Sequence, residues 1–431
     1  MVKNRYMDIF IECASRIGAQ RHLVAIRDGF ITIMPLIIVG SLAILINNFP
    51  PLGSFHLVDI LNNTFGEGNW QFVGSSIWRG TFAIIGVLVA FSISYHLAKS
   101  YHMNGLSAGL LTIAVYLILV PLTPDGGLNV DWLGAQGLFV AIILAVLVTE
   151  FTRLFITLGI TIKMPQGVPE GVANSFKALI PAIIILVSVG LFQSLLSIFI
   201  EKSIFEVIFT LIQRPLQGLG NTLAAALIVS FSTHILWFFG LHGTNILGAV
   251  IEPLYLPLIQ ENIELWNNGV SAFDVPNIIT KPFLDTYVFM GGAGTTVSLI
   301  IAIFIAVREE KKHPYREVAK FSSPAGLFNI NEPIIFGLPI VLNPIMLIPF
   351  VFVPVLLTII SYSALAINFV PKTVAMLPWA TPPIISGYLV SGGSWRGVLL
   401  QIVNLTVSVF VYLPFVVMGI RTMKKEKDYK S

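Results

Sequence analysis

Charge and cysteine are both scarce in this sequence. Only 11% of its 431 residues are charged, whereas an ordinary soluble domain carries about a quarter. Hydrophobic residues make up 55% of the chain, and its mean hydropathy is +0.86. Because a water-soluble surface needs more charge, this composition excludes a disordered chain, a basic nucleic-acid binder and almost any cytosolic globular enzyme. We therefore expect a membrane protein that binds no nucleic acid.

Several familiar spacings of reactive residues are also missing. The single cysteine, Cys13, excludes a disulfide within the chain. No Gly-x-x-x-x-Gly-Lys-Ser/Thr loop occurs, so the chain itself is not expected to hydrolyse ATP. No His-Glu-x-x-His or related ligand spacing occurs either, which argues against metal catalysis. We predict neither a metal site nor a cofactor.

Long stretches without charge predict the membrane spans. A bilayer core is about 30 Å thick and needs roughly 20 apolar residues per helix. We therefore expect an all-α polytopic membrane protein with about ten transmembrane helices, including full helices at 219–240 and about 345–370. The uncharged stretches are 29–49, 80–98, 104–124, 133–149, 178–200, 215–251, 286–307, 333–371, 373–395 and 397–420.

The positions of the basic residues predict the topology. Five Lys or Arg precede the first span, five lie in the loop 308–320, and five follow the last span. The positive-inside rule places these segments, and with them both termini, in the cytoplasm. The segments 47–78 and 122–132 contain no Lys or Arg and are expected to be external loops. No secretory signal is apparent at the start of the chain, so the N-terminus is expected to stay on the side where it was made. From the predicted spans we expect a multi-pass protein of the cell membrane.

Two apolar segments rich in proline and glycine lie near 323–342 and 377–393. Broken backbone at membrane depth survives only where it is buried in protein or lines a cavity. We therefore expect two re-entrant segments beside a binding site. The chain is predicted to divide into an N-terminal scaffold and dimerisation half, 1–214, with an interfacial connector at 162–177, and a transport half, 215–431.

Glu332 and His242 are the candidates for chemistry. An ionisable group inside a bilayer is costly and tends to face a partner or a water-filled cavity. Glu332 opens a helix-breaking segment, and His242 lies between glycines in Gly240-Leu-His242-Gly243. A carboxylate and an imidazole can together bind and polarise a hydroxyl group. An interfacial cap is the alternative for Glu332, and a structural hydrogen bond is the alternative for His242.

Neighbouring residues extend the candidate binding site. Trp379 and Trp237 offer rings on which a sugar can stack, and anchoring at the membrane interface is the alternative for both. Asn245 follows His242 by three residues. His234 precedes His242 by eight residues, with a structural role as its alternative.

Three further ionisable residues have no assigned role. Glu252 lies in or near a span, where it can be a gate residue, a paired group or an interfacial residue. Lys281 and Asp285 can pair if their segment is helical, because residues four apart share a helix face.

Two motifs carry a resemblance to a known family. They are Asn331-Glu332-Pro333-Ile-Ile-Phe-Gly337 and the His242 turn, Gly240-Leu-His242-Gly243. With the predicted spans, they resemble the membrane-spanning IIC subunits of the bacterial phosphoenolpyruvate-dependent sugar phosphotransferase system, in the lactose, cellobiose and diacetylchitobiose branch. The resemblance covers nearly the whole chain. It implies a homodimer of the bacterial cell membrane that imports a β-linked disaccharide.

The same resemblance implies site roles and partners. Glu332 and His242 would lie beside the hydroxyl to be phosphorylated, and Asn331 and Trp379 would contact the sugar. The partner subunits would be IIA and IIB, with a phosphocysteine on IIB as donor, usually to the 6-hydroxyl. Only 11 residues follow Ile420 and Cys13 lies in a short basic stretch, so the donor is expected on a separate chain. The chain would be the transport subunit of a protein-phosphohistidine sugar phosphotransferase.

Two other functions stay open at this point. A proton-coupled secondary sugar transporter would also place Glu and His inside the membrane, and it would accumulate unmodified sugar. An intramembrane enzyme would convert its substrate without moving it. The sequence does not choose between cellobiose, diacetylchitobiose, lactose or another β-glucoside as substrate.

Overall fold

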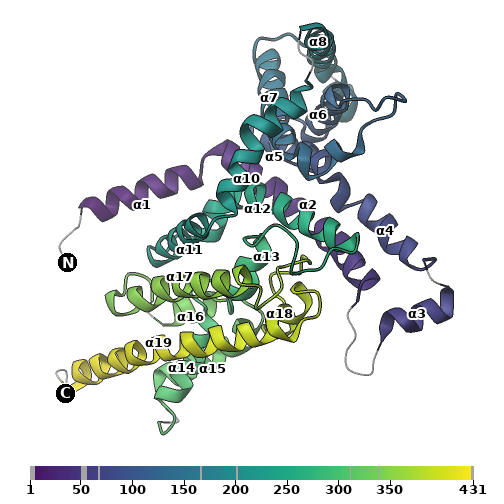
Figure 1. The fold of residues 1–431 in the computed structure, drawn as a ribbon. Coiled ribbons are helices and arrows are strands. Elements are labelled where there is room, and N and C mark those ends of the chain that lie inside the picture. The colour runs from purple at the N-terminus through teal and green to yellow at the C-terminus, as the bar shows by residue number, and fades with distance from the viewer. Residues whose placement is uncertain are drawn as a thin grey trace.

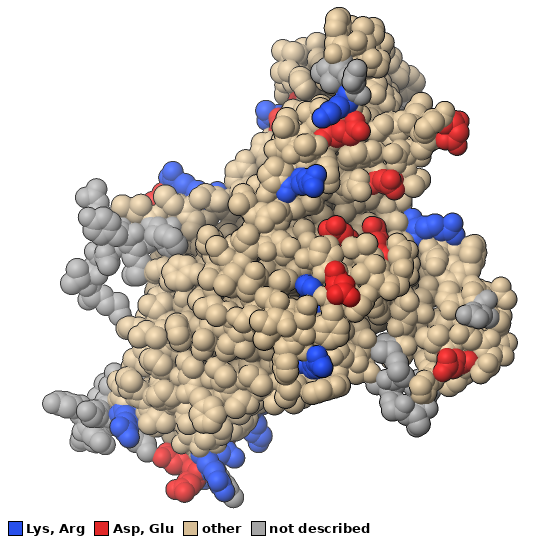
Figure 2. Space-filling view, in the orientation of Figure 1, with Lys and Arg blue, Asp and Glu red and all other residues tan. Residues whose placement is uncertain are grey.

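The computed structural model describes residues 5–49, 56–66, 68–165, 167–199, 202–310, 312–338 and 340–428. Every regular element in these ranges is helical, apart from an isolated antiparallel bridge between Leu122 and Leu128. Among the bases used to predict topology, Lys3, Lys311 and Lys430 lie outside the described residues. Figure 2 shows one face with broad uncharged areas, as expected of a protein surrounded by lipid.

The N-terminal half holds long apolar helices together with shorter ones, joined by turns and longer loops. Asn104 shows how one of them begins: its side chain accepts a 3.0 Å hydrogen bond from the Ser107 N–H and so caps the helix that follows. The elements are α1 Arg5–Gly18, α2 Arg21–Asn47, α3 Leu57–Phe65, α4 Gln71–Arg79, η1 Phe82–Ile84, α5 Ile85–Ser100, α6 Gly105–Leu119, η2 Val130–Leu133, η3 Ala135–Gly137, α7 Leu138–Thr157, α8 Glu170–Phe199, α9 Ile204–Ile208, η4 Phe209–Gln213 and α10 Arg214–Gly220.

The C-terminal half mixes long helices with short, interrupted ones. In Figure 1 the helices α11, α17 and α19 run roughly alongside one another, and the short helices α16 and α18 lie next to them. The elements are α11 Leu223–Phe238, α12 Gly243–Asn267, α13 Lys281–Phe283, η5 Leu284–Val288, α14 Thr296–Ala306, α15 Pro314–Leu327, α16 Glu332–Gly337, α17 Pro344–Ala366, α18 Ile385–Val390 and α19 Trp395–Asp428.

The buried apolar residues form two cores, one in each half of the chain. The first core is built mainly from α2, α5, α6 and α7, and the second from α11, η5, α14, α17 and α19. Helix α12 belongs to both, because Ile251, Tyr255 and Leu258 enter the second core while Leu256, Ile259 and Ile263 enter the first. The spacing of three or four residues in each set places the two cores against different faces of one helix.

Six helical stretches of the described chain, some of which combine consecutive elements, are long and apolar enough to cross a membrane. They are Arg21–Asn47, Gln71–Ser100, Ala135–Thr157, Phe176–Phe199, Pro344–Ala366 and Trp395–Met423. A bent pair, Ile204–Gly220 with Leu223–Phe238, adds one broken span, while α6 and α14 are apolar but shorter. The expectation of a polytopic helical protein is therefore confirmed, whereas the count of ten helices stays a prediction.

The helix expected at 219–240 is α11, Leu223–Phe238, which begins after a bend that the sequence did not predict. Helices α10 and α11 meet at an angle of 76°. At the break the Asn221 side chain accepts hydrogen bonds from the backbone N–H groups of Ile278 and Ile279, and Thr222 caps α11. Polar residues at the bend therefore hold a loop that is distant in the sequence. The absence of charge in this stretch did not predict that contact.

Three helix ends of the N-terminal half lie on the same side of the molecule. The guanidinium groups of Arg21 and Arg153 each lie 4.3 Å from the centroid of the Tyr101 ring. Arg21 begins α2, Tyr101 follows α5, and Arg153 lies near the end of α7. The order in which these helices cross the membrane stays a prediction.

Candidate functional site

The turn between α11 and α12 presents His242. Gly240 adopts a left-handed backbone (φ 78°) that favours glycine. Gly243 is packed so closely that a Cβ atom there would lie 2.1 Å from the Thr233 carbonyl oxygen. His242 is the N-cap of α12, and its Nδ1 atom accepts a 3.2 Å hydrogen bond from the Asn245 N–H. Because Nδ1 accepts, a neutral imidazole carries its proton on Nε2.

Glu332 faces this imidazole from the start of α16. Its Oε1 atom lies 3.8 Å from His242 Nε2, and the two side chains are 46% and 40% exposed. This separation is too long for a direct hydrogen bond. A hydroxyl oxygen about 2.8 Å from each atom would bond to both, with the carboxylate as acceptor and the imidazole as donor. The structure thus brings together the two residues selected for chemistry from the sequence.

The Trp237 ring packs against the His242 ring. The centroids of the indole and imidazole rings are 4.3 Å apart. Trp237 is buried, and its Nε1 atom has no hydrogen-bond partner among the described residues. Asn245 contacts His242 through its backbone N–H, and its side chain is exposed.

His234 lies elsewhere, in the hydrophobic core. It is fully buried, and its Nδ1 atom lies 2.5 Å from the Ser230 carbonyl oxygen. Its ring packs at 5.1 Å from Phe289 and 5.7 Å from Phe350, measured between centroids. In the described part of the chain, His234 makes no contact with Glu332 or His242.

Asn331 and Asn329 hold the turn that carries Glu332. Asn331 is buried, and its Nδ2 atom donates a 3.0 Å hydrogen bond to the Ala293 carbonyl. Asn329 has a left-handed backbone (φ 62°), and its Oδ1 atom accepts a 2.7 Å hydrogen bond from the Gly291 N–H. These two amides tie the turn after α15 to the glycine-rich loop before α14.

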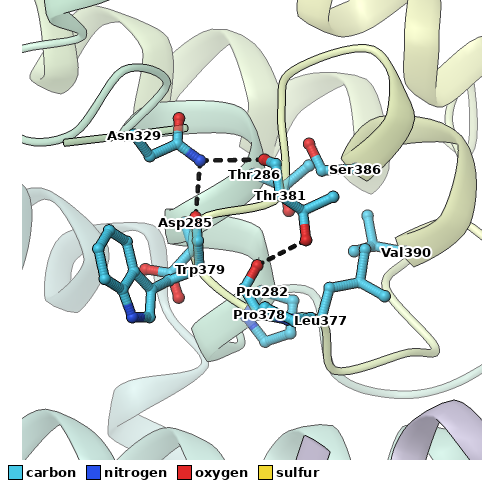
Figure 3. Close-up of a pocket in the computed structure, with 10 residues that line it drawn as sticks. All are labelled: Pro282, Asp285, Thr286, Asn329, Leu377, Pro378, Trp379, Thr381, Ser386 and Val390. Carbon is cyan, nitrogen blue, oxygen red and sulfur yellow. Dashed lines mark hydrogen bonds between the residues drawn. The ribbon is translucent and has the colours of Figure 1, made fainter. Parts of the chain in front are cut away.

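Asn329 also fixes the second proline-rich segment. Its Nδ2 atom donates to the carbonyl oxygens of Trp379 (2.6 Å) and Thr381 (3.0 Å), as Figure 3 shows. Asn329 was not among the residues selected from the sequence. Its role is evident only from its contacts with two segments that lie about 40 to 50 residues away in the chain.

A cavity opens beside this junction. Trp379 lines it and is 56% exposed. The cavity wall comes from α13, η5, the turn that carries Asn329, the irregular segment before α18, and α18 itself (Figure 3). Its lining residues are Pro282, Asp285, Thr286, Asn329, Leu377, Pro378, Trp379, Thr381, Ser386 and Val390.

The two proline- and glycine-rich segments are broken chain, as their composition predicted. The stretch 323–342 comprises the end of α15, a turn and the six residues of α16. The stretch 377–393 has irregular backbone before the six residues of α18. That both enter the membrane and leave on the same side remains a prediction.

Lys281 and Asp285 do pair. The Lys281 ammonium lies 2.8 Å and 2.6 Å from the two Asp285 carboxylate oxygens, and 4.0 Å from Oε1 of Glu252. Within the ranges that the structure describes, no group of three or more His, Cys, Asp or Glu residues is arranged to hold a metal ion.

Comparison with known proteins places this chain in a family. Residues 27–354 match the family described as "Phosphotransferase system, EIIC". The lichenan permease IIC component of Bacillus subtilis is 36% identical over 96% of this chain and 93% of its own length. The cellobiose-specific EIIC component of Geobacillus stearothermophilus is 38% identical over 96% of this chain and 92% of its own.

A solved structure shares the whole architecture. It is the crystal structure of the transporter ChbC, the IIC component of the N,N'-diacetylchitobiose-specific phosphotransferase system. The two chains superpose with a TM-score of 0.91 at 35% identity, covering 98% of this chain and 99% of the other. The chain therefore belongs to the EIIC family, the sugar permeases of the phosphotransferase system.

Proposed function

We propose that this permease imports a β-linked disaccharide and presents it for phosphorylation by a phosphocysteine on a separate IIB subunit. The relatives named above act on cellobiose, lichenan or diacetylchitobiose, whose sugar units are β-linked. Cellobiose or a closely related β-glucoside is therefore the proposed substrate. Family membership favours this function over a proton-coupled transporter that leaves its sugar unmodified.

The observation that carries the proposal is the gap between Glu332 and His242. One sugar hydroxyl that bridges these two atoms, 3.8 Å apart, from one side would donate its proton toward the carboxylate and accept from the imidazole. Glu332 then acts as general base and takes the hydroxyl proton while the hydroxyl oxygen attacks the phosphoryl group, the S–P bond breaks and the IIB cysteine leaves as its thiolate. Trp237 keeps the imidazole in place, and Trp379 offers a ring face to the sugar.

Phosphorylation supplies the direction of transport. A phosphate adds close to two negative charges at pH 7. Beside the Glu332 carboxylate these charges repel, so the product is released. Return of a doubly charged sugar through an apolar membrane is blocked, because burying an unpaired charge is costly.

Two cores support a division of labour within the chain. We assign residues 1–214 to a scaffold that contacts a second copy in a homodimer, and residues 215–431 to transport. Because α12 packs against both cores, it is the helix across which movement of the transport half would be transmitted.

The termini and the loop 308–320 are assigned to the cytoplasmic side from their Lys and Arg content. Arg21, Tyr101 and Arg153 support the order of crossings that this assignment requires. Separate IIA and IIB subunits would meet the permease on this side of the plasma membrane.

The test is the chemical form of the transported sugar. Right-side-out vesicles with the permease take up radiolabelled cellobiose only when phosphoenolpyruvate and the soluble phosphotransferase proteins are enclosed within them, and the internal product is a sugar phosphate. Accumulation of unmodified sugar under a pH gradient, without phosphoenolpyruvate, would instead identify a secondary transporter.

A further inference from the structure

Two arginines share one tyrosine ring on the side of the N-terminal half where α2 begins and α5 and α7 end. The guanidinium groups of Arg21 and Arg153 each lie 4.3 Å from the centroid of the Tyr101 ring, so they are separated by no more than twice that distance. The Debye length at physiological ionic strength is about 8 Å. The two positive charges therefore act on the same neighbouring groups.

The Glu150 carboxylate lies in this cluster, and both of its oxygens are engaged. Oε1 accepts a 2.5 Å hydrogen bond from the Tyr101 hydroxyl and lies 2.9 Å from Nε2 of His22. Oε2 lies 3.1 Å from Nε of Arg153. Within the part of the chain that the structure describes, Arg21 forms no ion pair with a carboxylate. Glu150 therefore balances one of the two arginine charges, and the cluster keeps a surplus of positive charge.

The cluster borders an exposed apolar face of α7. This helix forms most of the candidate span Ala135–Thr157, and the Arg153 side chain near its C-terminal end is 45% exposed. Large apolar side chains that are 46–64% exposed repeat along α7 and at its C-cap with a spacing of three or four residues, which places them on one helix face. They are Leu147, Phe151, Leu154 and Leu158. A charged group thus lies at the end of an apolar surface of the kind that contacts a membrane or a partner.

The Lys and Arg content assigns this side of the molecule to the cytoplasm. The cytoplasmic leaflet carries anionic lipids, and basic pockets between transmembrane helices on that side bind their headgroups. Arginine suits this role because its planar guanidinium group offers parallel N–H groups to phosphate oxygens. An anionic phospholipid would match both parts of the surface, with its phosphate at the guanidinium groups and its acyl chains against the apolar face of α7.

From this geometry we propose that Arg21 and Arg153 together bind the phosphate group of an anionic phospholipid whose acyl chains lie along α7. Tyr101 is a positioning residue, because its ring contacts both guanidinium groups and its hydroxyl holds Glu150. The bound lipid would join the start of α2 to the ends of α5 and α7 at the membrane surface. All these residues belong to the N-terminal half, so the inference does not depend on which sugar the permease carries.

Arginines that only anchor helix ends at the membrane surface make a different prediction. Such residues interact with the headgroup region as a whole, so phosphatidylglycerol and phosphatidylcholine with the same acyl chains should bind alike. Phosphorylated IIB is another ligand that two guanidinium groups could meet, but a soluble protein offers no acyl chain to the apolar face of α7. If IIB is the ligand, then removal of the arginines should impair phosphoryl transfer and leave lipid binding unchanged.

The experiment measures lipid binding to the purified, delipidated full-length protein by native mass spectrometry. The probes are phosphatidylglycerol and phosphatidylcholine with identical acyl chains, and inorganic phosphate as competitor. Loss of hydrogen bonds between charged groups predicts that R21Q/R153Q binds the first phosphatidylglycerol about tenfold to a hundredfold more weakly, with phosphatidylcholine unchanged. Arg79→Gln is the matched control, because Arg79 lies over the Phe72 ring at the opposite end of the span Gln71–Ser100 from Tyr101. Its lipid affinity should stay within about twofold of wild type.

Glu150→Gln changes the charge of the cluster in the opposite direction. It removes the carboxylate while keeping the side-chain shape, so it should bind phosphatidylglycerol about threefold to tenfold more tightly than wild type. This variant carries the test if R21Q/R153Q does not fold. Equal binding of the two lipids by the wild type, or wild-type phosphatidylglycerol affinity in folded R21Q/R153Q or folded Glu150→Gln, would overturn the inference. Displacement of the lipid by an equal concentration of inorganic phosphate would also overturn it, because the site would then bind a free anion.

Discussion

The Nε2 atom of His242 and the Oε1 atom of Glu332 face each other across 3.8 Å, although the residues lie 90 positions apart in the chain. Separate elements position them: the glycine-flanked turn before α12 and the first turn of α16. At this distance the two side chains do not form a direct hydrogen bond with each other. The pair is therefore suited to bind one hydroxyl group that bridges both side chains.

Gly243→Ala should damage the site by displacing the His242 turn. A Cβ atom would lie 2.1 Å from the Thr233 carbonyl oxygen, so the turn or α11 must shift, at a cost of about 1–3 kcal/mol in the free energy of unfolding. We expect a lower thermal unfolding temperature and at least a tenfold lower rate of sugar phosphorylation.

Gly248→Ala is the matched control in the same helix. The nearest atom to a Cβ there is the Arg27 Cγ at 3.4 Å, which is an ordinary contact. Alanine is also the better helix former by up to about 1 kcal/mol. Normal phosphorylation by Gly243→Ala, at the wild-type unfolding temperature, would contradict the packing described for this turn.

Asn329→Gly should release the Trp379 segment while leaving its own turn unstrained. Glycine accepts the left-handed backbone at 329, but three hydrogen bonds to Gly291, Trp379 and Thr381 are lost. Buried groups without partners cost about 1–3 kcal/mol each. We expect weaker disaccharide binding, measured by calorimetry, and faster fluctuation of the Trp379 ring, measured by time-resolved fluorescence anisotropy.

Asn329→Ala provides the comparison. It loses the same bonds and adds strain, because alanine disfavours a φ of 62°. Its unfolding temperature should therefore lie below that of the glycine variant, with similar sugar affinity. Wild-type affinity in both variants would mean that the Trp379 segment does not contribute to binding.

Cys13→Ser should leave sugar phosphorylation unchanged when IIA and IIB are supplied. Cys13 is exposed on α1, at the N-terminal end of the chain and outside both cores. If the phosphoryl group comes from a cysteine of a separate subunit, then this thiol has no part in the transfer. Loss of phosphorylation by the variant would place the donor on this chain.

The sequence was most informative where its composition was least typical. Because charges are so few, Glu332 was recognisable as an ionisable residue before a broken apolar segment, and glycines marked the His242 turn. The spacing of Lys281 and Asp285 likewise predicted their ion pair. In each case a local pattern carried the information.

Features that depend on distant segments were not predictable. Asn329 joins three parts of the chain, and no residue near it in sequence indicates its partners. The bend between α10 and α11 is held by residues 278 and 279, and nothing in the uncharged stretch around it indicates these partners. The cavity wall beside Asp285 is likewise built from segments about 40 to 100 residues apart.

The central claim is that Glu332 acts on the hydroxyl that receives the phosphoryl group. Its most direct test is single-turnover transfer from phosphorylated IIB to cellobiose already bound to the permease, comparing wild type with Glu332→Gln. The glutamine keeps the shape of the side chain but is a far weaker base, so general-base loss predicts a rate about 10²–10⁴-fold lower at saturating sugar. Transfer by the folded, sugar-bound glutamine variant at the wild-type rate would contradict the account.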